Sequence, residues 1–215
     1  MSPKVKSPLK SIPGLRTILI SLRLFPLKIK SFFQWENLAR QDIIKLELGS
    51  GSKKGTNGFT TVDIRGADIY RDLRNGIPLK NNTVNIIYTS HLLEHIPYSQ
   101  LISFLNECLR VLKDGGRLSV CVPNARNYIE AYIEQRHFGN SDNFYKPAVV
   151  DTGSFIDQVN YMAYMAGEHC YMFDEENLVN TLRKVGFTSV ELRAFDESID
   201  LKERDFESIY ATAIK

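Results

Sequence analysis

The sequence predicts an α/β fold in which helices alternate with the strands of a mostly parallel sheet. From Ile43 onward, short apolar runs alternate with turn signals and helical stretches, which is typical of βαβ units. A run that ends in Glu47-Leu48 leads directly into two glycines, as at a strand end that binds a ligand. The chain has 215 residues, 43% of them hydrophobic, which is enough for one buried core. We therefore predict one domain, residues 41–215, with appendages.

Residues 1–40 are predicted to form a basic amphipathic N-terminal arm. Eight Lys or Arg and one acidic residue, Glu36, give this segment a net charge of +7, whereas the remainder of the chain carries −5. The pattern is typical of a membrane-surface or partner-binding element, and it also suits an irregular arm or short helix packed on the main domain. Arg16 and Arg23 interrupt the apolar stretch, which argues against a secretory signal. The sequence has no apolar run of about 18 residues, so we expect no membrane-spanning helix.

Seven strands and two helices are predicted after the arm. The strands are Ile43–Leu48, Phe59–Ile64, a short piece near Ile69, Val84–Thr89, Arg117–Val122, Ser189–Arg193 and Ser208–Ala213. One helix follows Pro97, carries apolar residues at helical spacing from Leu101 to Leu112, and is expected to stop at Asp114-Gly115-Gly116. A second begins at Asp174, an N-cap type of residue, and ends at Gly186.

Residues 124–172 break this rhythm and are predicted to form an inserted cap over the carboxyl edge of the sheet. Ligands of open α/β sheets bind outside that edge, so such a cap would select the substrate. Four tyrosines of the segment line an acceptor pocket in one interpretation and belong to a core in the other: Tyr128, Tyr132, Tyr161 and Tyr164.

Three unevenly spaced cysteines indicate neither a disulfide framework nor a zinc knuckle: Cys108, Cys121 and Cys170. A reducing cytosol fits this usage. We therefore expect a cytoplasmic protein, with peripheral membrane contact through residues 1–40 as the open alternative.

The strand ends carry residues that suit an adenosine-containing cofactor. Gly49 and Gly51 allow a tight turn and a close approach of the backbone to a ligand, directly after the acidic Glu47. Asp63 ends the second strand, where a carboxylate accepts hydrogen bonds from ribose hydroxyls. Asp72-Leu73 follows the third strand and suits an adenine amino group and an adenine face.

These residues and others resemble the class I S-adenosylmethionine-dependent methyltransferases, in particular the small bacterial type. The matching stretches are Leu48 to Gly51, Val62-Asp63, Asp72-Leu73, Ser90 to Ile96, Leu109 to Leu118, Val122-Pro123-Asn124 and Gly186-Phe187. Each stretch is common, but their order and spacing are difficult to obtain by chance.

The resemblance implies a Rossmann-like seven-stranded sheet in the order 3-2-1-4-5-7-6, with strand 7 antiparallel and helices on both faces. It implies that Glu47, Gly49 and Gly51 surround the methionine part of S-adenosylmethionine and that Asp63 binds the ribose. By the same resemblance, Asp72 and Leu73 bind the adenine, and Ser90 with His91 lines the floor beside the sulfonium. Many members of the branch act in sugar and cell-surface polysaccharide chemistry, so we expect a small-molecule or glycan acceptor.

The chain departs from the family in the loop after the first glycines. Many members carry a third glycine where Lys53 stands, followed by a regular helix. Here Ser52 to Gly58 is polar and too short for a normal helix. A helix dipole therefore contributes less to cofactor binding than in those members.

The segment from His91 to His95 matches the pattern H-x-x-E-H of inverted zincins. A zinc hydrolase would need this pattern in a long helix with a third ligand downstream, whereas Pro97 leaves about one turn. We therefore expect no metal and interpret Glu94 and His95 as residues that pack and hydrogen-bond behind the fourth strand.

Methyl transfer to oxygen, the expected reaction, needs a general base. His169, between the cap and the Asp174 helix, is the predicted base because histidine titrates near neutrality. A packing histidine is the competing interpretation. His91 is the second predicted catalytic residue.

Three other functions remain open from the sequence. A nicotinamide-dependent dehydrogenase shares the glycines and the acid, but the form Glu47-Leu48-Gly49-Ser50-Gly51 favours the methyl donor. A nucleic-acid methyltransferase is a minor alternative, because the main domain is net acidic and phosphates favour basic surfaces. A non-catalytic scaffold or membrane-tethered partner is the remaining one. The sequence does not predict the oligomeric state.

Overall fold

The computed structural model describes the backbone of residues 15–139 and 151–215, and the side chains of these ranges from residue 25 onward. Parts of the predicted arm and cap, residues 1–14 and 140–150, lie outside the described residues. Seven strands form one sheet in the order β3-β2-β1-β4-β5-β7-β6, as expected. They are β1 Lys45–Leu48, β2 Phe59–Asp63, β3 Ile69–Tyr70, β4 Val84–Ser90, β5 Leu112–Pro123, β6 Thr188–Arg193 and β7 Ser208–Ile214.

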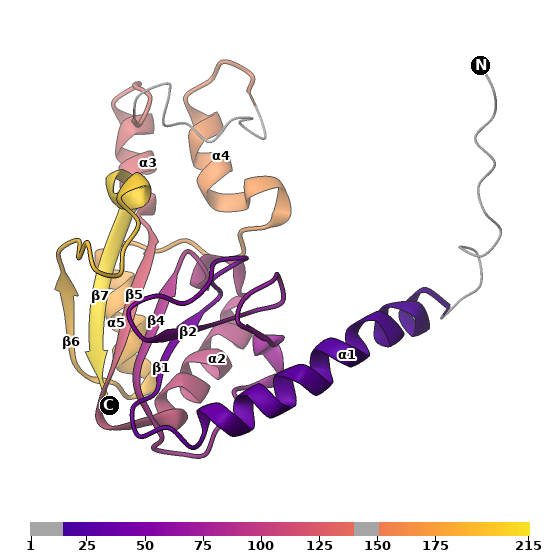
Figure 1. Cartoon of the computed structure of the whole chain (residues 1–215). Helices are drawn as coiled ribbons and strands as arrows, with labels where there is room; N and C mark the ends of the chain where they lie inside the picture. The colour runs from indigo at the N-terminus through magenta and orange to yellow at the C-terminus, as the bar shows by residue number, and fades with distance from the viewer. Residues whose placement is uncertain (1–14, 140–150) are drawn as a thin grey trace, which may run out of the picture.

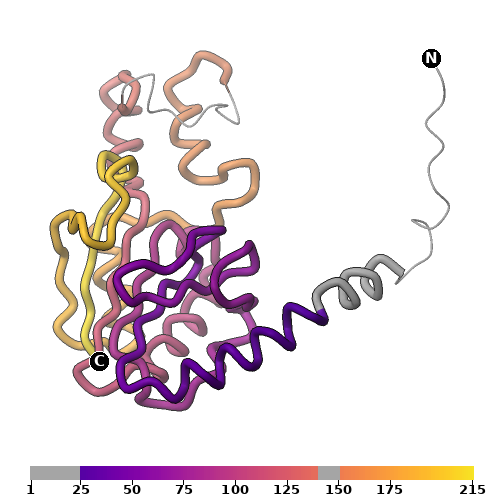
Figure 2. Tube along the Cα trace, viewed as in Figure 1, coloured from indigo at the N-terminus to yellow at the C-terminus, as the bar shows by residue number. Residues whose placement is uncertain are grey.

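The sheet is parallel from β3 to β5, and β7 runs antiparallel to both β5 and β6. The central strands bury apolar side chains in the core, as expected for strands that are covered on both faces. Leu46, Leu48, Val62, Ile87 and Leu118 are fully buried. Strands from the earlier part of the chain lie toward one edge of the sheet. The strands after residue 151, β7 and β6, lie at the opposite edge (Figure 2). The predicted fold class is confirmed.

Five α-helices are described: α1 Leu15–Leu38, α2 Tyr98–Val111, α3 Ala125–Ile133, α4 Ile156–Tyr164 and α5 Glu175–Val185. The predicted limits of α5 are confirmed. The side chain of Asp174 accepts a hydrogen bond from Asn177 N at 2.8 Å, and Gly186 ends the helix with φ of 110°.

The predicted end of α2 is wrong. The helix ends at Val111, and β5 begins at Leu112, so Asp114-Gly115-Gly116 lies within the strand and not at a helix end. Leu112 is fully buried and pairs with Val84 of β4. Burial of this leucine against the neighbouring strand therefore overrides the helical spacing of the sequence. β1 likewise begins at Lys45, two residues later than predicted.

Helix α1 packs on the domain through its C-terminal end (Figure 1). Trp35 and Leu38 are buried there, and the Ser31 hydroxyl donates to the Tyr70 carbonyl at 2.7 Å. Several apolar side chains of the helix face solvent instead: Phe25, Leu27, Ile29, Phe32 and Phe33. None of the described helices is both long and apolar enough to cross a membrane.

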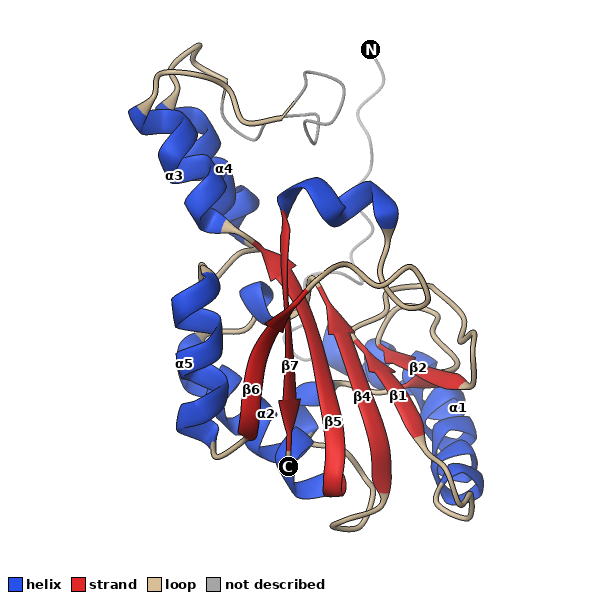
Figure 3. Ribbon diagram, turned by 90° about the vertical axis from the view of Figure 1, so that its left-hand side faces the viewer, coloured by secondary structure: helices blue, strands red, loops and turns tan. Residues whose placement is uncertain are grey.

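Helices α3 and α4 pack against each other beyond the carboxyl end of β5 (Figure 3). Between them lies a second hydrophobic cluster of Ala125, Tyr128, Tyr161 and Met162. Of the four tyrosines considered above, Tyr128 and Tyr161 therefore belong to a core, whereas Tyr132 and Tyr164 are exposed.

Candidate active site

The loop after β1 is shaped by two glycines with different surroundings. Both have positive φ, 75° at Gly49 and 64° at Gly51. A Cβ on Gly49 would lie 2.7 Å from the Leu92 side chain, so the loop packs closely there against the segment after β4. A Cβ on Gly51 would meet nothing within 4 Å. The backbone at Gly51 is therefore open to a ligand.

The predicted cofactor carboxylates at β1 and β2 already have partners within the protein. Glu47, which is buried, accepts from Lys53 Nζ at 3.0 Å. Asp63 accepts from the backbone N–H of Gly51 at 3.0 Å and of Arg65 at 2.8 Å. A carboxylate has about four lone-pair sites, so both groups retain acceptor capacity for a ligand.

Asp72 and Leu73 lie after β3, where Asp72 is the N-cap of a short 3-10 turn, Leu73–Asn75. The carboxylate of Asp72 accepts two hydrogen bonds from the Arg74 guanidinium, at 2.9 and 2.8 Å. This guanidinium lowers the pKa of Asp72. Leu73 is partly buried and packs against the main core.

Asp68, which was not among the predicted site residues, holds the short loop that stands where many family members have a helix. Its Oδ2 accepts from the Gly55 N–H at 2.8 Å and from the N–H and hydroxyl of Thr61 at 3.1 and 2.8 Å. Burial opposes ionisation, but the Thr61 and Gly55 hydrogen bonds hold the pKa of Asp68 below its ordinary value. The Thr-x₆-Asp spacing alone carries no recognisable signal, because the contact depends on the pairing of β2 and β3.

His91 follows β4 with a left-handed backbone, φ of 48°, which is uncommon for a residue other than glycine. Its N–H donates to the Cys121 carbonyl at 2.9 Å, and its Nε2 lies 2.9 Å from the Ser208 hydroxyl. Burial lowers the pKa of His91 to about 3. The imidazole is therefore neutral at physiological pH. Ser90, the last residue of β4, is half-buried beside it.

Glu94 is the most deeply buried acidic side chain near this strand end, with 2% of its surface exposed. It lies in a single 3-10 turn, Leu93–His95, as the nearby proline predicts. Neither of its oxygens has a hydrogen-bond partner among the described residues. Nδ1 of His91 lies 3.6 Å and Nε2 of His95 lies 3.8 Å from its Oε1. Burial raises the pKa of Glu94 to about 8.

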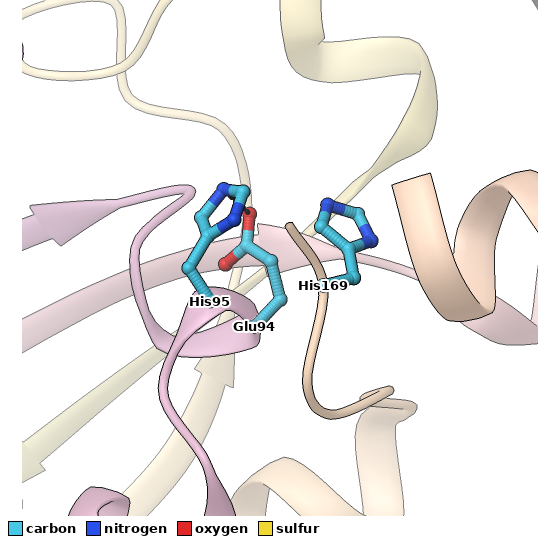
Figure 4. Close-up of side chains that lie close together, drawn as sticks. All are labelled: Glu94, His95 and His169. Carbon is cyan, nitrogen blue, oxygen red and sulfur yellow. Dashed lines mark ion pairs between the residues drawn. The ribbon is translucent and has the colours of Figure 1, made fainter. Parts of the chain in front are cut away.

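His169 comes from the segment after α4 and lies beside Glu94 and His95 (Figure 4). The rings of His95 and His169 are in an edge contact, with centroids 4.9 Å apart. His169 is 8% exposed, its Nδ1 lies 2.7 Å from the Met162 carbonyl, and burial lowers its pKa. His169 and the Glu94-His95 pair are separate features in the sequence. No local pattern indicates that residues about 75 positions apart meet.

Buried polar atoms without hydrogen-bond partners concentrate at these strand ends. Among the described residues six such atoms exist, and four belong to Ser50, Thr89 and Glu94, at the carboxyl ends of β1 and β4 or directly after them. Orphaned polar atoms are costly in a folded protein and indicate a place where a ligand completes the site. Together with the open backbone at Gly51, they fit a polar ligand held across β1 and β4.

Comparison with known proteins decides the family. Residues 31–192, well over half of the chain, match the model of the methyltransferase domain family. The chain belongs to this family. It is therefore a class I S-adenosylmethionine-dependent methyltransferase, and the predicted enzyme class and cofactor are confirmed.

Individual relatives are distant. A segment of 71 residues is 34% identical to an uncharacterized protein of Methanocaldococcus jannaschii, and it spans 33% of this chain and 28% of that protein. An S-adenosylmethionine-dependent methyltransferase of Thermotoga maritima has a similar structure, with a TM-score of 0.50, 16% identity, and coverage of 93% of this chain and 97% of its own. A methyltransferase of Archaeoglobus fulgidus gives a TM-score of 0.48 at 14% identity, with 92% and 93% coverage.

The residues present fit the cofactor. Glu47 and Asp63 supply acceptors for an ammonium group and for hydroxyls, and the Ser50 hydroxyl in the same loop has no hydrogen-bond partner among the described residues. A Cβ at Gly51 would meet nothing within 4 Å, so the space beside its backbone is open. S-adenosylmethionine, when bound, supplies an electrophilic methyl group on a positively charged sulfur.

Proposed function

We propose that this methyltransferase acts on a hydroxyl oxygen of a small molecule or glycan. The observation that carries the proposal is the environment of His169. Its Nδ1 is engaged by the Met162 carbonyl, which places the proton on Nδ1 and leaves Nε2 as an acceptor. An acceptor nitrogen on a buried imidazole is what a hydroxyl needs when it loses its proton during attack.

The remaining residues align the reactants. Methyl transfer is an in-line displacement, so the protein contributes mainly orientation and exclusion of water. In this proposal Glu47, Gly49 and Gly51 hold the methionine part of the cofactor, and Asp63 holds the ribose. Asp72 and Leu73 contact the adenine, and Ser90 and His91 form the floor. His91 remains a predicted catalytic residue, and its bond to Ser208 favours a positioning role.

The acceptor class rests on the surface beyond the strand ends. Tyr132 of α3 and Tyr164 of α4 are exposed, and aromatic faces suit sugar rings as well as flat aromatic acceptors. The chain after residue 40 is net acidic, which disfavours a phosphate backbone. Nucleic acid is therefore the less favoured acceptor.

The experiment is a methyl-transfer screen of sugars, glycosides and phenols with labelled S-adenosylmethionine, with the position of the new methyl group determined by mass spectrometry and NMR. His169→Gln should lower kcat by about 10²–10⁴, the usual contribution of a general base. Cofactor affinity should stay within about threefold, a change below 1 kcal/mol. The exposed His137 provides a matched control, because His137→Gln should leave kcat unchanged. Methylation found only at nitrogen, or full turnover by His169→Gln, would contradict the proposal.

We also propose that α1 contacts a membrane surface. Phe25, Phe32 and Phe33 are each about 60% exposed, and Lys28 and Lys30 lie among them. An exposed apolar strip with lysines beside it is typical of an interfacial helix.

Sedimentation with anionic and neutral vesicles tests this second proposal. We expect the full chain to sediment with anionic vesicles and the double variant Phe32→Ser/Phe33→Ser to remain in solution. Ile43→Ser, which removes an equally exposed apolar side chain outside the helix, is the control and should sediment like the wild type. Equal sedimentation of the double variant and the wild type would overturn the assignment of the surface to α1.

A further inference from the structure

Three side chains from two distant segments meet at the carboxyl end of β4, and among the described residues no hydrogen bond joins Glu94 to either histidine. Glu94 and His95 belong to the turn after β4, and His169 belongs to the segment after α4 (Figure 4). One oxygen or nitrogen of each lies within 4.8 Å of the others. We propose that Glu94, His95 and His169 form a binding site for one divalent transition-metal cation.

The hydrogen bonds around the two imidazoles determine which nitrogens face the cluster. Nδ1 of His95 lies 3.0 Å from the Glu168 carbonyl, and Nδ1 of His169 lies 2.7 Å from the Met162 carbonyl. A carbonyl only accepts, so each Nδ1 carries the proton and each Nε2 has a lone pair. This is the arrangement found at metal-binding histidines, where a backbone carbonyl fixes the tautomer from behind.

Glu94 loses its proton when a cation binds, and its carboxylate then supplies the negative charge. Glu94 is 2% exposed, and both of its oxygens lack a hydrogen-bond donor among the described residues. Two imidazole lone pairs and a buried carboxylate thus have no donor to satisfy them within the cluster. A cation with N and O ligands supplies what is missing.

Backbone hydrogen bonds fix the two segments before any cation binds. The N–H groups of Cys170 and Tyr171 both donate to the Glu94 carbonyl, at 2.7 and 3.1 Å. His169 is therefore held next to the turn that carries the other two ligands. Such preorganisation lowers the conformational cost of binding.

Zinc is the metal that this ligand set fits best. Two histidines and one glutamate, with a further position open, are a common catalytic zinc set. Tetrahedral zinc requires ligand atoms about 3.4 Å apart, so small side-chain rotations would close the present spacing of 4.8 Å. The motif is still not that of a zincin, because His95 and Glu94 share one short turn and the remaining ligand comes from after α4.

The proposal concerns cation binding and does not depend on the acceptor. In the loaded protein Nε2 of His169 would be a ligand, and an acceptor hydroxyl bound to the cation would have its pKa lowered by the metal. Because Nε2 of His169 cannot act as base and as ligand at once, turnover after chelation reports the base role and metal affinity reports the cation site, so the two results are separate.

The test is zinc and cobalt binding by the full chain after treatment with a chelator. Zinc affinity is measured by competition with a chromophoric chelator, and cobalt reports its ligands through its visible absorption. The variants are Glu94→Gln, His95→Gln and His169→Gln, with His137→Gln and Cys170→Ser as controls. Circular dichroism and S-adenosylhomocysteine binding establish that each variant is folded.

We expect one equivalent of metal, bound with micromolar or tighter affinity, and a cobalt spectrum without a thiolate charge-transfer band. Each of the three variants should weaken binding by at least about tenfold, and the two controls should bind like the wild type. No stoichiometric binding by the wild type would overturn the site. Equal weakening in His137→Gln or Cys170→Ser would overturn it as well.

Discussion

The acidic residues of the two ligand-facing regions have opposite surroundings. After β1, β2 and β3, each carboxylate has hydrogen-bond donors close to it in sequence: Lys53 for Glu47, Gly51 and Arg65 for Asp63, and Arg74 for Asp72. After β4, Glu94 is buried without a hydrogen-bond donor among the described residues, and its neighbours are histidines. We call these the cofactor region and the histidine region.

Because only the carboxylates of the cofactor region have hydrogen-bond donors, the acidic residues of the two regions affect the stability of the fold in opposite ways. In the cofactor region the carboxylates hold loops in place and keep free lone pairs, so in our proposal they contribute to folding and to binding together. In the histidine region the fold carries a carboxylate whose desolvation is not compensated within the described protein, which costs stability. The histidine region is therefore the part of the site that we propose a ligand or cation completes.

The largest expected effect is a difference in the free energy of unfolding between variants of two buried glutamates. Glu94 is 2% and Glu207 is 3% exposed, but only Glu207 accepts a hydrogen bond, from the Tyr128 hydroxyl at 2.7 Å. Glu94→Met should raise the free energy of unfolding by about 1–3 kcal/mol, because it removes an unsatisfied buried group. Glu207→Met should lower it by about 1–3 kcal/mol, because it removes the acceptor of a buried hydroxyl.

Urea unfolding in the presence of a chelator measures both values without a contribution from bound metal. Destabilisation by Glu94→Met of the same size as by Glu207→Met would remove the distinction between the two regions. It would mean that Glu94 has a stabilising partner in the folded protein.

The second effect concerns binding in the cofactor region. Asp63→Ala should weaken S-adenosylhomocysteine binding by about 10–100-fold, the value of hydrogen bonds to a charged group. Part of the loss should come from the Gly51 loop, whose N–H donates to Asp63. Calorimetric titration measures the affinity, and Asp63→Asn should recover part of it by keeping an acceptor. Unchanged affinity in Asp63→Ala would remove this residue from the cofactor site.

The same contrast explains which features of the site could be predicted from the sequence and which could not. The strand order was predicted from the resemblance to the methyltransferase family. The predicted residues of the cofactor region follow from local motifs, because Gly49, Gly51 and Asp63 lie within two strands and one loop. The meeting of Glu94 with His169 has no local signal, because it depends on where the segment after α4 returns to the sheet. The end of α2 was predicted wrongly for a similar reason, since the burial of Leu112 is decided by its strand partner.

A smaller effect is expected for Asp68, which holds the short loop in place of a helix. Asp68→Ala should lower the free energy of unfolding by about 1–2 kcal/mol at neutral pH through the lost Gly55 and Thr61 hydrogen bonds. The pKa of Asp68 is lowered in the folded protein, so its contribution is complete above the ordinary value of 3.8 and disappears as the pH falls through the folded value. The difference between variant and wild type should therefore shrink in strongly acidic buffer. A difference independent of pH would show that the charge of Asp68 is not what holds the loop.

The smallest expected effect tests whether Lys53 competes with the cofactor for the Glu47 carboxylate. The Lys53 ammonium occupies Glu47 at 3.0 Å, although Lys53 is one-third exposed and Glu47 is buried. If the cofactor ammonium binds the same carboxylate, the Lys53 charge opposes it, and a partly exposed ion pair is worth below about 1 kcal/mol. Lys53→Met should therefore raise S-adenosylhomocysteine affinity by about two- to fivefold, whereas Lys54→Met should leave it unchanged. A fall in affinity would mean that Lys53 instead binds the cofactor carboxylate, and that this loop replaces the missing helix N-terminus with a side-chain charge.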